Sequence, residues 1–247
     1  MKNNNPFLGF GYLVKGIKML MTPGLKRFLM VPFLINILIF ALAGWLGYTQ
    51  FNELMDWLLP EDSWLAYFRW ILWPLFAVTI LLVTFYTFTA VANLLAAPFN
   101  SILAAKVENM VTGKPPLDNR EKLSEIIIPT ILSELRKLSY FLIRAVPLLL
   151  LFLIPGINLF APLIWVLFSA WFLSLEYADY PMGNHGMTFP QQHKRIKNVR
   201  LTALGFGGGV TLMTMIPIVN FIAMPSAVIG ATLFWLGQKE KLMAEQV

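Results

Sequence analysis

The segment Thr22-Pro23-Gly24-Leu25-Lys26-Arg27 contains the residue types of a binding site for an oxyanion. Threonine is a favoured N-cap and proline is favoured in the first helical position, so the pattern predicts a helix that begins at Thr22. The N–H groups of Gly24, Leu25 and Lys26 would then have no partner within the helix, and they would attract an anion together with the helix dipole. Lys26 and Arg27 add positive charge, and the arginine fork suits a tetrahedral oxyanion. The alternative is that these basic residues only mark the cytoplasmic end of a membrane helix.

A polar stripe along the apolar segment 70–105 is a candidate lining for an anion path. Its members recur every seven residues: Thr79, Tyr86, Asn93 and Asn100. Seven residues drift by only ~20° on a straight α-helix, so these side chains would share one face. Asn158 and Asn220, at two proline breaks further along the chain, are candidates for the same path. The alternatives are hydrogen bonds between helices for the stripe and capping of turns for the two asparagines.

The composition indicates that a membrane surrounds these residues. The 247-residue chain is 57% hydrophobic and only 13% charged, whereas soluble domains contain ~25% charged residues. Four runs contain no charged residue: 28–52, 70–105, 145–175 and 201–238. Each run exceeds the ~18 residues that indicate a membrane span, so the sequence excludes an ordinary soluble fold and a disordered chain.

The distribution of Lys and Arg predicts the topology. Segment 53–69 contains one basic residue, Arg69, against the acids Glu53, Asp56, Glu61 and Asp62. The positive-inside rule therefore places 53–69 outside and the other polar segments in the cytoplasm. This arrangement needs only two complete crossings, at 23–52 and 70–110. The net charge of +6 is then a topology signal, and no nucleic-acid partner is expected.

The last two apolar runs are each interrupted by related sequences. The segments IPGINLFA, from Ile154, and IPIVNFIA, from Ile216, align as an internal repeat. Proline with glycine or asparagine stops a helix and turns the chain. Only about 10 residues, or ~15 Å of helix, separate Ala145 from Pro155, against ~30 Å of hydrocarbon, so this arm is too short to span unless its helix starts earlier, in the amphipathic stretch 130–144. We therefore expect two re-entrant helical hairpins, at 130–175 and 195–238. The alternative is four ordinary spans, which gives six in all.

The N-terminal residues predict a short amphipathic helix over 6–22. Apolar residues recur at three- and four-residue spacing, and Lys15 and Lys18 lie away from them; the apolar set is Phe10, Leu13, Val14, Ile17, Leu20 and Met21. This pattern is typical of a helix that lies in the membrane interface. The expected fold is thus an all-α integral membrane protein, a single domain over 1–247. It has two long transmembrane helices, two partly inserted (re-entrant) hairpins and an interfacial helix.

The sequence offers little for catalysis or metal binding. It contains no cysteine, and the two histidines, His185 and His193, have no obvious catalytic partner. Their spacing fits no standard helical metal pair, even with Glu176 and Asp179 nearby, so a loop role is favoured. We expect no enzyme activity, no metal and no cofactor. The glycines 207–209 lack the lysine of a phosphate-binding loop and favour close helix packing.

Several motifs together resemble the CysZ family of bacterial sulfate permeases. The first is Gly24-Leu25-Lys26-Arg27-Phe28, continuing as Pro32-Phe33-Leu34-Ile35-Asn36. The others are Asn93-Leu94-Leu95-Ala96-Ala97-Pro98-Phe99-Asn100 with Lys106-Val107-Glu108, Glu176-Tyr177-Ala178-Asp179-Tyr180-Pro181-Met182, and Asn220-Phe221-Ile222-Ala223-Met224-Pro225. The resemblance covers about residues 5 to 240, which is nearly the whole chain.

The resemblance implies sulfate uptake across the bacterial inner membrane by a multi-pass protein, supplying cysteine synthesis. It also implies two long membrane helices, two partly inserted hairpins and a homo-oligomer. Its sulfate-binding motif corresponds to Gly24, Leu25, Lys26 and Arg27, with Lys26 in a place where the motif often has arginine. Sulfite or related oxyanions and membrane lipid are further expected partners. The competing functions are a membrane scaffold or lipid-binding protein and, less favoured, a membrane enzyme acting on phosphorylated lipids.

Overall fold

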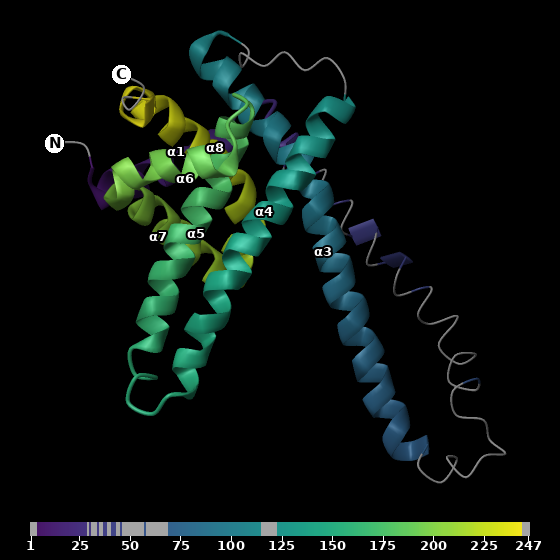
Figure 1. Cartoon of the computed structure of the whole chain (residues 1–247). Helices are drawn as coiled ribbons and strands as arrows, with labels where there is room; N and C mark the ends of the chain where they lie inside the picture. Colours follow the sequence, from purple (N-terminus) through teal and green to yellow (C-terminus); the bar gives the residue numbers. More distant parts are fainter. Residues whose placement is uncertain are drawn as a thin grey trace. The chain divides into compact units, whose positions relative to one another are not determined.

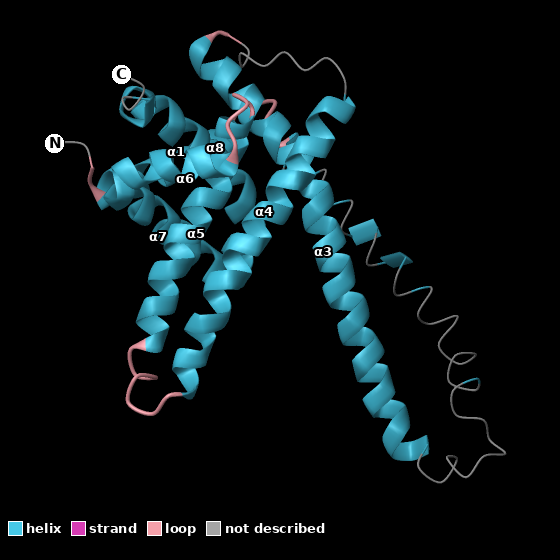
Figure 2. Cartoon of the chain, viewed as in Figure 1, coloured by secondary structure: helices cyan, strands magenta, loops and turns pink. Residues whose placement is uncertain are grey.

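The computed structural model describes residues 4–28, 69–114 and 123–243, together with a few single residues between 30 and 57. These residues form helices joined by loops, and no strand occurs among them (Figure 2). The expected all-α class is therefore confirmed for the described chain. Most of the expected first crossing, 23–52, and of the outside segment 53–69 lies outside the described residues.

The helices fall into two compact units, one of residues 1–29 and 97–247 and one of residues 30–96. The first unit contains α1 (Pro6–Leu20), the C-terminal part of α3 (Arg69–Thr112), α4 (Leu123–Leu150), α5 (Ala161–Gly183), α6 (Phe189–Ile196), α7 (Arg200–Met215) and α8 (Pro217–Met243) (Figure 1). Short 3₁₀ turns, η2 (Leu151–Leu153) and η3 (Lys197–Val199), follow α4 and α6. The second unit contains the remainder of α3.

Helix α1 packs against α7 and α8 rather than lying free. Its start is fixed by Asn5, whose side chain accepts a hydrogen bond from the Phe7 N–H at 2.8 Å, and by Pro6 in the first turn. The buried face is Gly9, Leu13, Gly16 and Leu20. A Cβ on Gly9 would collide with the backbone of α7, and one on Gly16 with the backbone of α8.

This packing differs from the predicted apolar face of α1. Leu13 and Leu20 of the apolar face that was predicted to meet the membrane interface are buried against protein, whereas Phe10 is 47% and Met21 54% exposed. The buried edge instead uses glycines, because small residues let two helix backbones approach closely. The same close approach occurs at Gly207, where a Cβ would collide with the backbone of α5 at Ala170, so the expectation for that glycine is confirmed.

The two predicted breaks share a local backbone geometry. Ile154 and Ile216 both leave the helix in an extended conformation, at φ/ψ of −90/114° and −100/110°. Each donates its N–H to the carbonyl three residues earlier at 3.3 Å. The N–H of Asn158 then donates to Ile154 at 3.0 Å, and that of Asn220 to Ile216 at 2.8 Å. The internal repeat is therefore visible in the structure.

The two breaks diverge after this point. Residues 155–160 form turns before α5 begins, whereas α8 begins at Pro217, directly after Ile216. Gly156 has φ of +84°, a conformation that costs an L-residue about 1–2 kcal/mol. The aligned residue of the second break is Ile218, which lies in the first turn of α8. The glycine thus accounts for the wider turn of the first hairpin.

The first arm of the first hairpin is longer than the segment from Ala145 to Pro155. Helix α4 begins at Leu123 and contains 28 residues, or ~42 Å, which exceeds the ~30 Å of hydrocarbon. Figure 1 shows α4 and α5 side by side, with the turn at their far end. Among the described residues, two helical segments are long and apolar enough to cross a membrane, Ala161–Gly183 and Pro217–Lys239. Both are second arms of the expected hairpins.

Candidate functional site

The segment from Thr22 to Phe28 forms turns rather than the expected first helical turn. The N–H of Leu25 donates to the Thr22 carbonyl at 3.1 Å, and that of Phe28 to the Leu25 carbonyl at 2.9 Å. Helical backbone begins only at Arg27. The prediction of a helix start at Thr22 is therefore wrong, because Gly24, at φ of +88°, takes the chain through a conformation that no helix contains.

The predicted set of free N–H donors also changes. The Leu25 N–H is committed to Thr22, whereas those of Gly24 and Lys26 have no acceptor within the described residues. The Leu25 side chain is fully buried and belongs to the same core cluster as Leu103 and Val107 of α3. Leu25 thus anchors the turn on α3, while the side chains of Lys26 and Arg27 are exposed.

A third cation, Lys106 of α3, joins this segment. A Cβ on Gly24 would lie 3.5 Å from Lys106 Nζ, so the ammonium group occupies the space beside the glycine. Both cations lie near the Phe28 ring, whose centroid is 5.2 Å from Arg27 Cζ and 6.0 Å from Lys106 Nζ. Within the described part of the chain, no carboxylate pairs with these cations. The sequence placed Lys106 only in a motif, and its approach to Gly24 is a tertiary contact.

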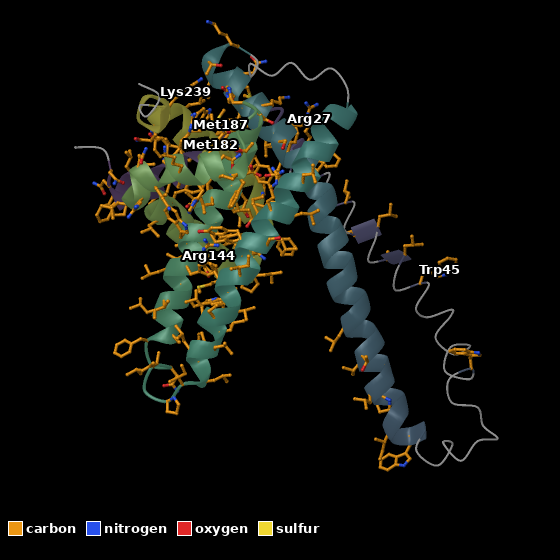
Figure 3. The ribbon with its side chains drawn as sticks, in the orientation of Figure 1. Arg27, Trp45, Arg144, Met182, Met187 and Lys239 are labelled. Carbon is orange, nitrogen blue, oxygen red and sulfur yellow. The ribbon has the colours of Figure 1, made fainter. Side chains whose placement is uncertain are left out.

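The acid nearest to Lys106 in sequence faces elsewhere. Glu108 is 4% exposed, and His185 Nε2 donates to its Oε1 at 2.8 Å and its Oε2 at 3.0 Å. Residues two apart on a helix do not face each other, so this carboxylate does not neutralise Lys106. Glu108 is buried because the loop after α5 brings His185 over it. The segment 24–27 and Lys106 together form a net positive surface, here called the Gly24 site (Figure 3 labels Arg27).

The candidate path residues have different surroundings. Thr79 is exposed and its hydroxyl donates to Leu75 of its own helix at 2.8 Å, and the side chains of Tyr86 and Asn93 lie outside the described residues. Asn100 is buried, and its Nδ2 finds no acceptor among the described groups. Asn158 and Asn220 are exposed at the two breaks. The structure does not bring this set together into one described lining.

A buried ionic cluster joins α4, α5 and α6. Lys137 Nζ lies 3.0 Å from Asp179 Oδ2, with side chains 2% and 7% exposed. Ser133 donates to Asp179 at 2.8 Å and Gln192 donates to it at 2.6 Å. Sequence periodicity does not reveal this cluster, because its members lie on three helices. In the described ranges, no group of three or more histidine and acidic side chains is placed to hold a metal ion.

The chain is similar to proteins of one known family over most of its length. A family model described as "Sulfate transporter CysZ/Etoposide-induced protein 2.4" matches residues 12–225. The chain belongs to this family. The CysZ resemblance seen in the sequence motifs is thus confirmed, and the matched range contains both the Gly24 site and the two breaks.

Relatives named "Sulfate transporter CysZ" cover nearly the whole chain. The CysZ protein of Pseudomonas aeruginosa (strain LESB58) is 42% identical over 232 residues, which is 92% of this chain and 94% of that protein. That of Pseudomonas fluorescens (strain Pf0-1) is 41% identical over 231 residues, 92% of each. That of Pectobacterium atrosepticum is 38% identical over 239 residues, 96% of this chain and 87% of the relative. Membership of the CysZ family makes this chain a membrane protein.

Proposed function

We propose that this protein takes up sulfate across the bacterial inner membrane and captures the anion at the Gly24 site. The proposal rests on the relatives named sulfate transporter CysZ, which align over more than nine tenths of the chain. Their name supports sulfate as the substrate and transport as the function. These names describe transport and not catalysis, as expected from the sequence. The sulfate taken up would supply cysteine synthesis.

The chemistry of the Gly24 site suits a tetrahedral dianion. Lys26 and Arg27 are exposed and Lys106 lies beside Gly24, so a dianion at this turn would meet three positive charges. Gly24 has no side chain, and the free N–H groups of Gly24 and Lys26 add neutral donors. Leu25 holds the turn on the core, which fixes the positions of the cations before the anion arrives. Sulfite and related oxyanions would meet the same groups.

The proposed membrane arrangement follows the sequence and the exposed apolar surface. The protein is multi-pass, with long crossings at 23–52 and 70–110 and two re-entrant hairpins at 130–175 and 195–238. The tips of both hairpins are strongly apolar, with Leu159 78% and Ile218 83% exposed. Helix α1 lies in the interface, since it exposes both an apolar side chain, Phe7 at 82%, and its lysines. The protein assembles as a homo-oligomer, and the polar stripe of α3 and the two break asparagines line its anion path.

The test compares sulfate binding and sulfate uptake into liposomes for charge-removing variants. We expect Lys26→Ala/Arg27→Ala to weaken sulfate binding by at least about tenfold, because each hydrogen bond from a charged group contributes ~1.5–3 kcal/mol. Lys106→Ala should weaken it also. The matched control is Lys15→Ala/Lys18→Ala, which removes two exposed charges from α1 and should leave binding unchanged.

The outcomes separate the site from the function. Unchanged sulfate affinity and uptake in the Lys26→Ala/Arg27→Ala variant would refute the Gly24 site. No sulfate flux for the wild-type protein in liposomes would refute transport and favour a membrane scaffold. Turnover of a phosphorylated lipid by the purified protein would favour an enzyme.

A further inference from the structure

A second basic site, here called the second cavity, lies away from the Gly24 site and is widely open to the surface. It has a volume of about 380 Å³ and opens among α4, α5, α6 and the start of α7. Its polar walls are Tyr140 and Arg144 of α4, Trp171 of α5, His193 of α6, Lys197 of η3 and Arg200 of α7. Figure 3 labels Arg144 on α4 and Arg27 beside α3, at separate places in the same unit. None of these residues belongs to a sequence motif that predicts a binding site.

The guanidinium groups of this cavity contact neutral groups of the protein. Arg144 Cζ lies 3.6 Å from the centroid of the Tyr140 ring, and its Nη1 donates to the Tyr140 carbonyl at 3.2 Å. Arg200 Nε donates to the Lys197 carbonyl at 3.1 Å. Each guanidinium has five N–H donors, so most of them remain available to a ligand. In the part of the chain that the structure describes, no carboxylate pairs with Arg144, Lys197 or Arg200.

The pKa of His193 is affected by the same positive charges. Burial lowers the pKa of His193 below its ordinary value of 6.5, and the charges of Lys197 and Arg144 lower it further. Trp171 Nε1 donates to the Tyr140 hydroxyl at 3.2 Å, which leaves the hydroxyl hydrogen for His193 Nε2 at 3.3 Å. This chain of neutral groups fixes the aromatic wall of the cavity. An anion is therefore the ligand that the unneutralised charge favours.

The position of the cavity indicates which anion. Arg144 is the last charged residue before the charge-free run 145–175, and Ile143 beside it is 71% exposed. Cationic and aromatic side chains at such a boundary lie at the depth of the lipid headgroups. The volume falls in the ~300–1,000 Å³ range of small-molecule pockets and offers far more room than a five-atom oxyanion fills.

We propose that this cavity binds the phosphate group of a membrane phospholipid, with Arg144, Lys197 and Arg200 as its cationic ligands. The acyl chains would then lie along the exposed apolar surface of the α4–α5 hairpin. A lipid seated there would contact all four elements that meet at the base of this hairpin. The site is independent of sulfate capture at Gly24.

The test uses the full-length protein stripped of lipid in detergent, with native mass spectrometry of bound lipid and thermal unfolding as readouts. The probes are phosphatidylglycerol, diacylglycerol with the same acyl chains, inorganic phosphate and sulfate. We expect the wild-type protein to retain phosphatidylglycerol and to be stabilised by it. Diacylglycerol, inorganic phosphate and sulfate should not bind in this cavity and should not stabilise the protein through it. Arg144→Gln/Arg200→Gln should retain at least about tenfold less phosphatidylglycerol.

The controls keep the proposal falsifiable. Lys26→Gln/Arg27→Gln removes the same number of charges at the Gly24 site and should retain phosphatidylglycerol like the wild type. Arg200→Gln alone, at an exposed position, serves if the double variant does not fold, and it should also retain less lipid. Equal retention of phosphatidylglycerol by the wild-type and cavity variants would overturn the proposal. So would equal binding of diacylglycerol, or cavity-dependent binding of free phosphate or sulfate as strong as that of the lipid. None of these results bears on sulfate uptake.

Discussion

The buried contact between Glu108 and His185 permits a sharp test of how the Gly24 site keeps its charge. One histidine nitrogen donates to both carboxylate oxygens, at 2.8 and 3.0 Å, and the side chains are only 5% and 6% exposed. A hydrogen bond to a charged group contributes ~1.5–3 kcal/mol. For a chain of this size, each kcal/mol shifts the unfolding temperature by about 2–4 °C. We therefore expect Glu108→Gln to lower it by about 3–12 °C.

The assay is a double-mutant cycle of Glu108→Gln, His185→Gln and the combined variant, with thermal unfolding in detergent as the readout. The His185 ring also lies 5.5 Å from the Trp235 ring, and the cycle separates the loss of that contact from the loss of the pair. We expect the combined variant to be more stable than the sum of the single effects implies. Strict additivity of the two substitutions would refute the contact.

Sulfate affinity supplies the second half of this test. If the Glu108 carboxylate is committed to His185, then Glu108→Gln should leave the sulfate dissociation constant within about twofold of the wild type. If Glu108 instead faced Lys106, removal of its negative charge would tighten sulfate binding. Tighter binding would therefore refute the reasoning that separates the two groups.

Three other substitutions test the fold and the second cavity. Asp179→Asn removes the negative charge 3.0 Å from the buried ammonium of Lys137, and it should destabilise the protein by up to ~3–5 kcal/mol in thermal unfolding; unchanged stability would contradict the buried pair. Gly156→Ala should cost about 1–2 kcal/mol because φ is +84°, whereas Gly11→Ala, with open space at its Cβ, is the control that should not destabilise. His193 has a pKa below 6.5, so the unfolded chain binds its proton first and stability should fall as the pH drops below 6.5. Unfolding temperatures at pH 7.5 and 5.5 should show a smaller drop for His193→Gln, and an equal drop would contradict this sign.

The sequence predicted those parts of the fold that depend on local signals. The all-α class followed from the apolar runs, and the breaks at Ile154 and Ile216 followed from proline in a repeated segment. The repeat did not predict that the breaks diverge. The divergence follows from the positive φ of Gly156, and the second segment has no glycine at the aligned position. A single difference of this kind does not stand out in an alignment of two otherwise similar segments. The first arm of the first hairpin is long enough to span because α4 begins at Leu123, before the charge-free run, and residues of mixed polarity left the position of this helix start open in the sequence.

The candidate site was predicted by residue type but not by geometry. Lys26 and Arg27 are exposed as an anion site requires, yet the donors come from a turn rather than from a helix start. Lys106, 79 positions beyond Arg27 in the numbering, could not be placed because its approach to Gly24 is a tertiary contact. The second cavity was missed for the same reason, since Arg144 and Arg200 belong to separate helices and only the folded chain brings them to one wall.

The packing of α1 has a consequence for the order of synthesis. The Asn5 N–H donates to the Thr202 hydroxyl at 3.1 Å, and the Thr202 N–H donates to the Asn4 side chain at 3.1 Å. Among the described helices, α1 is synthesised before α7 and α8. At ~5–20 residues per second, α1 waits roughly 10–40 s for its partners. During that interval its apolar side chains need another surface, and the lipid into which the chain is being inserted provides one. A ribosome that stalls before α7 would leave a nascent chain in which α1 lacks both of the helices that it packs against in the folded protein.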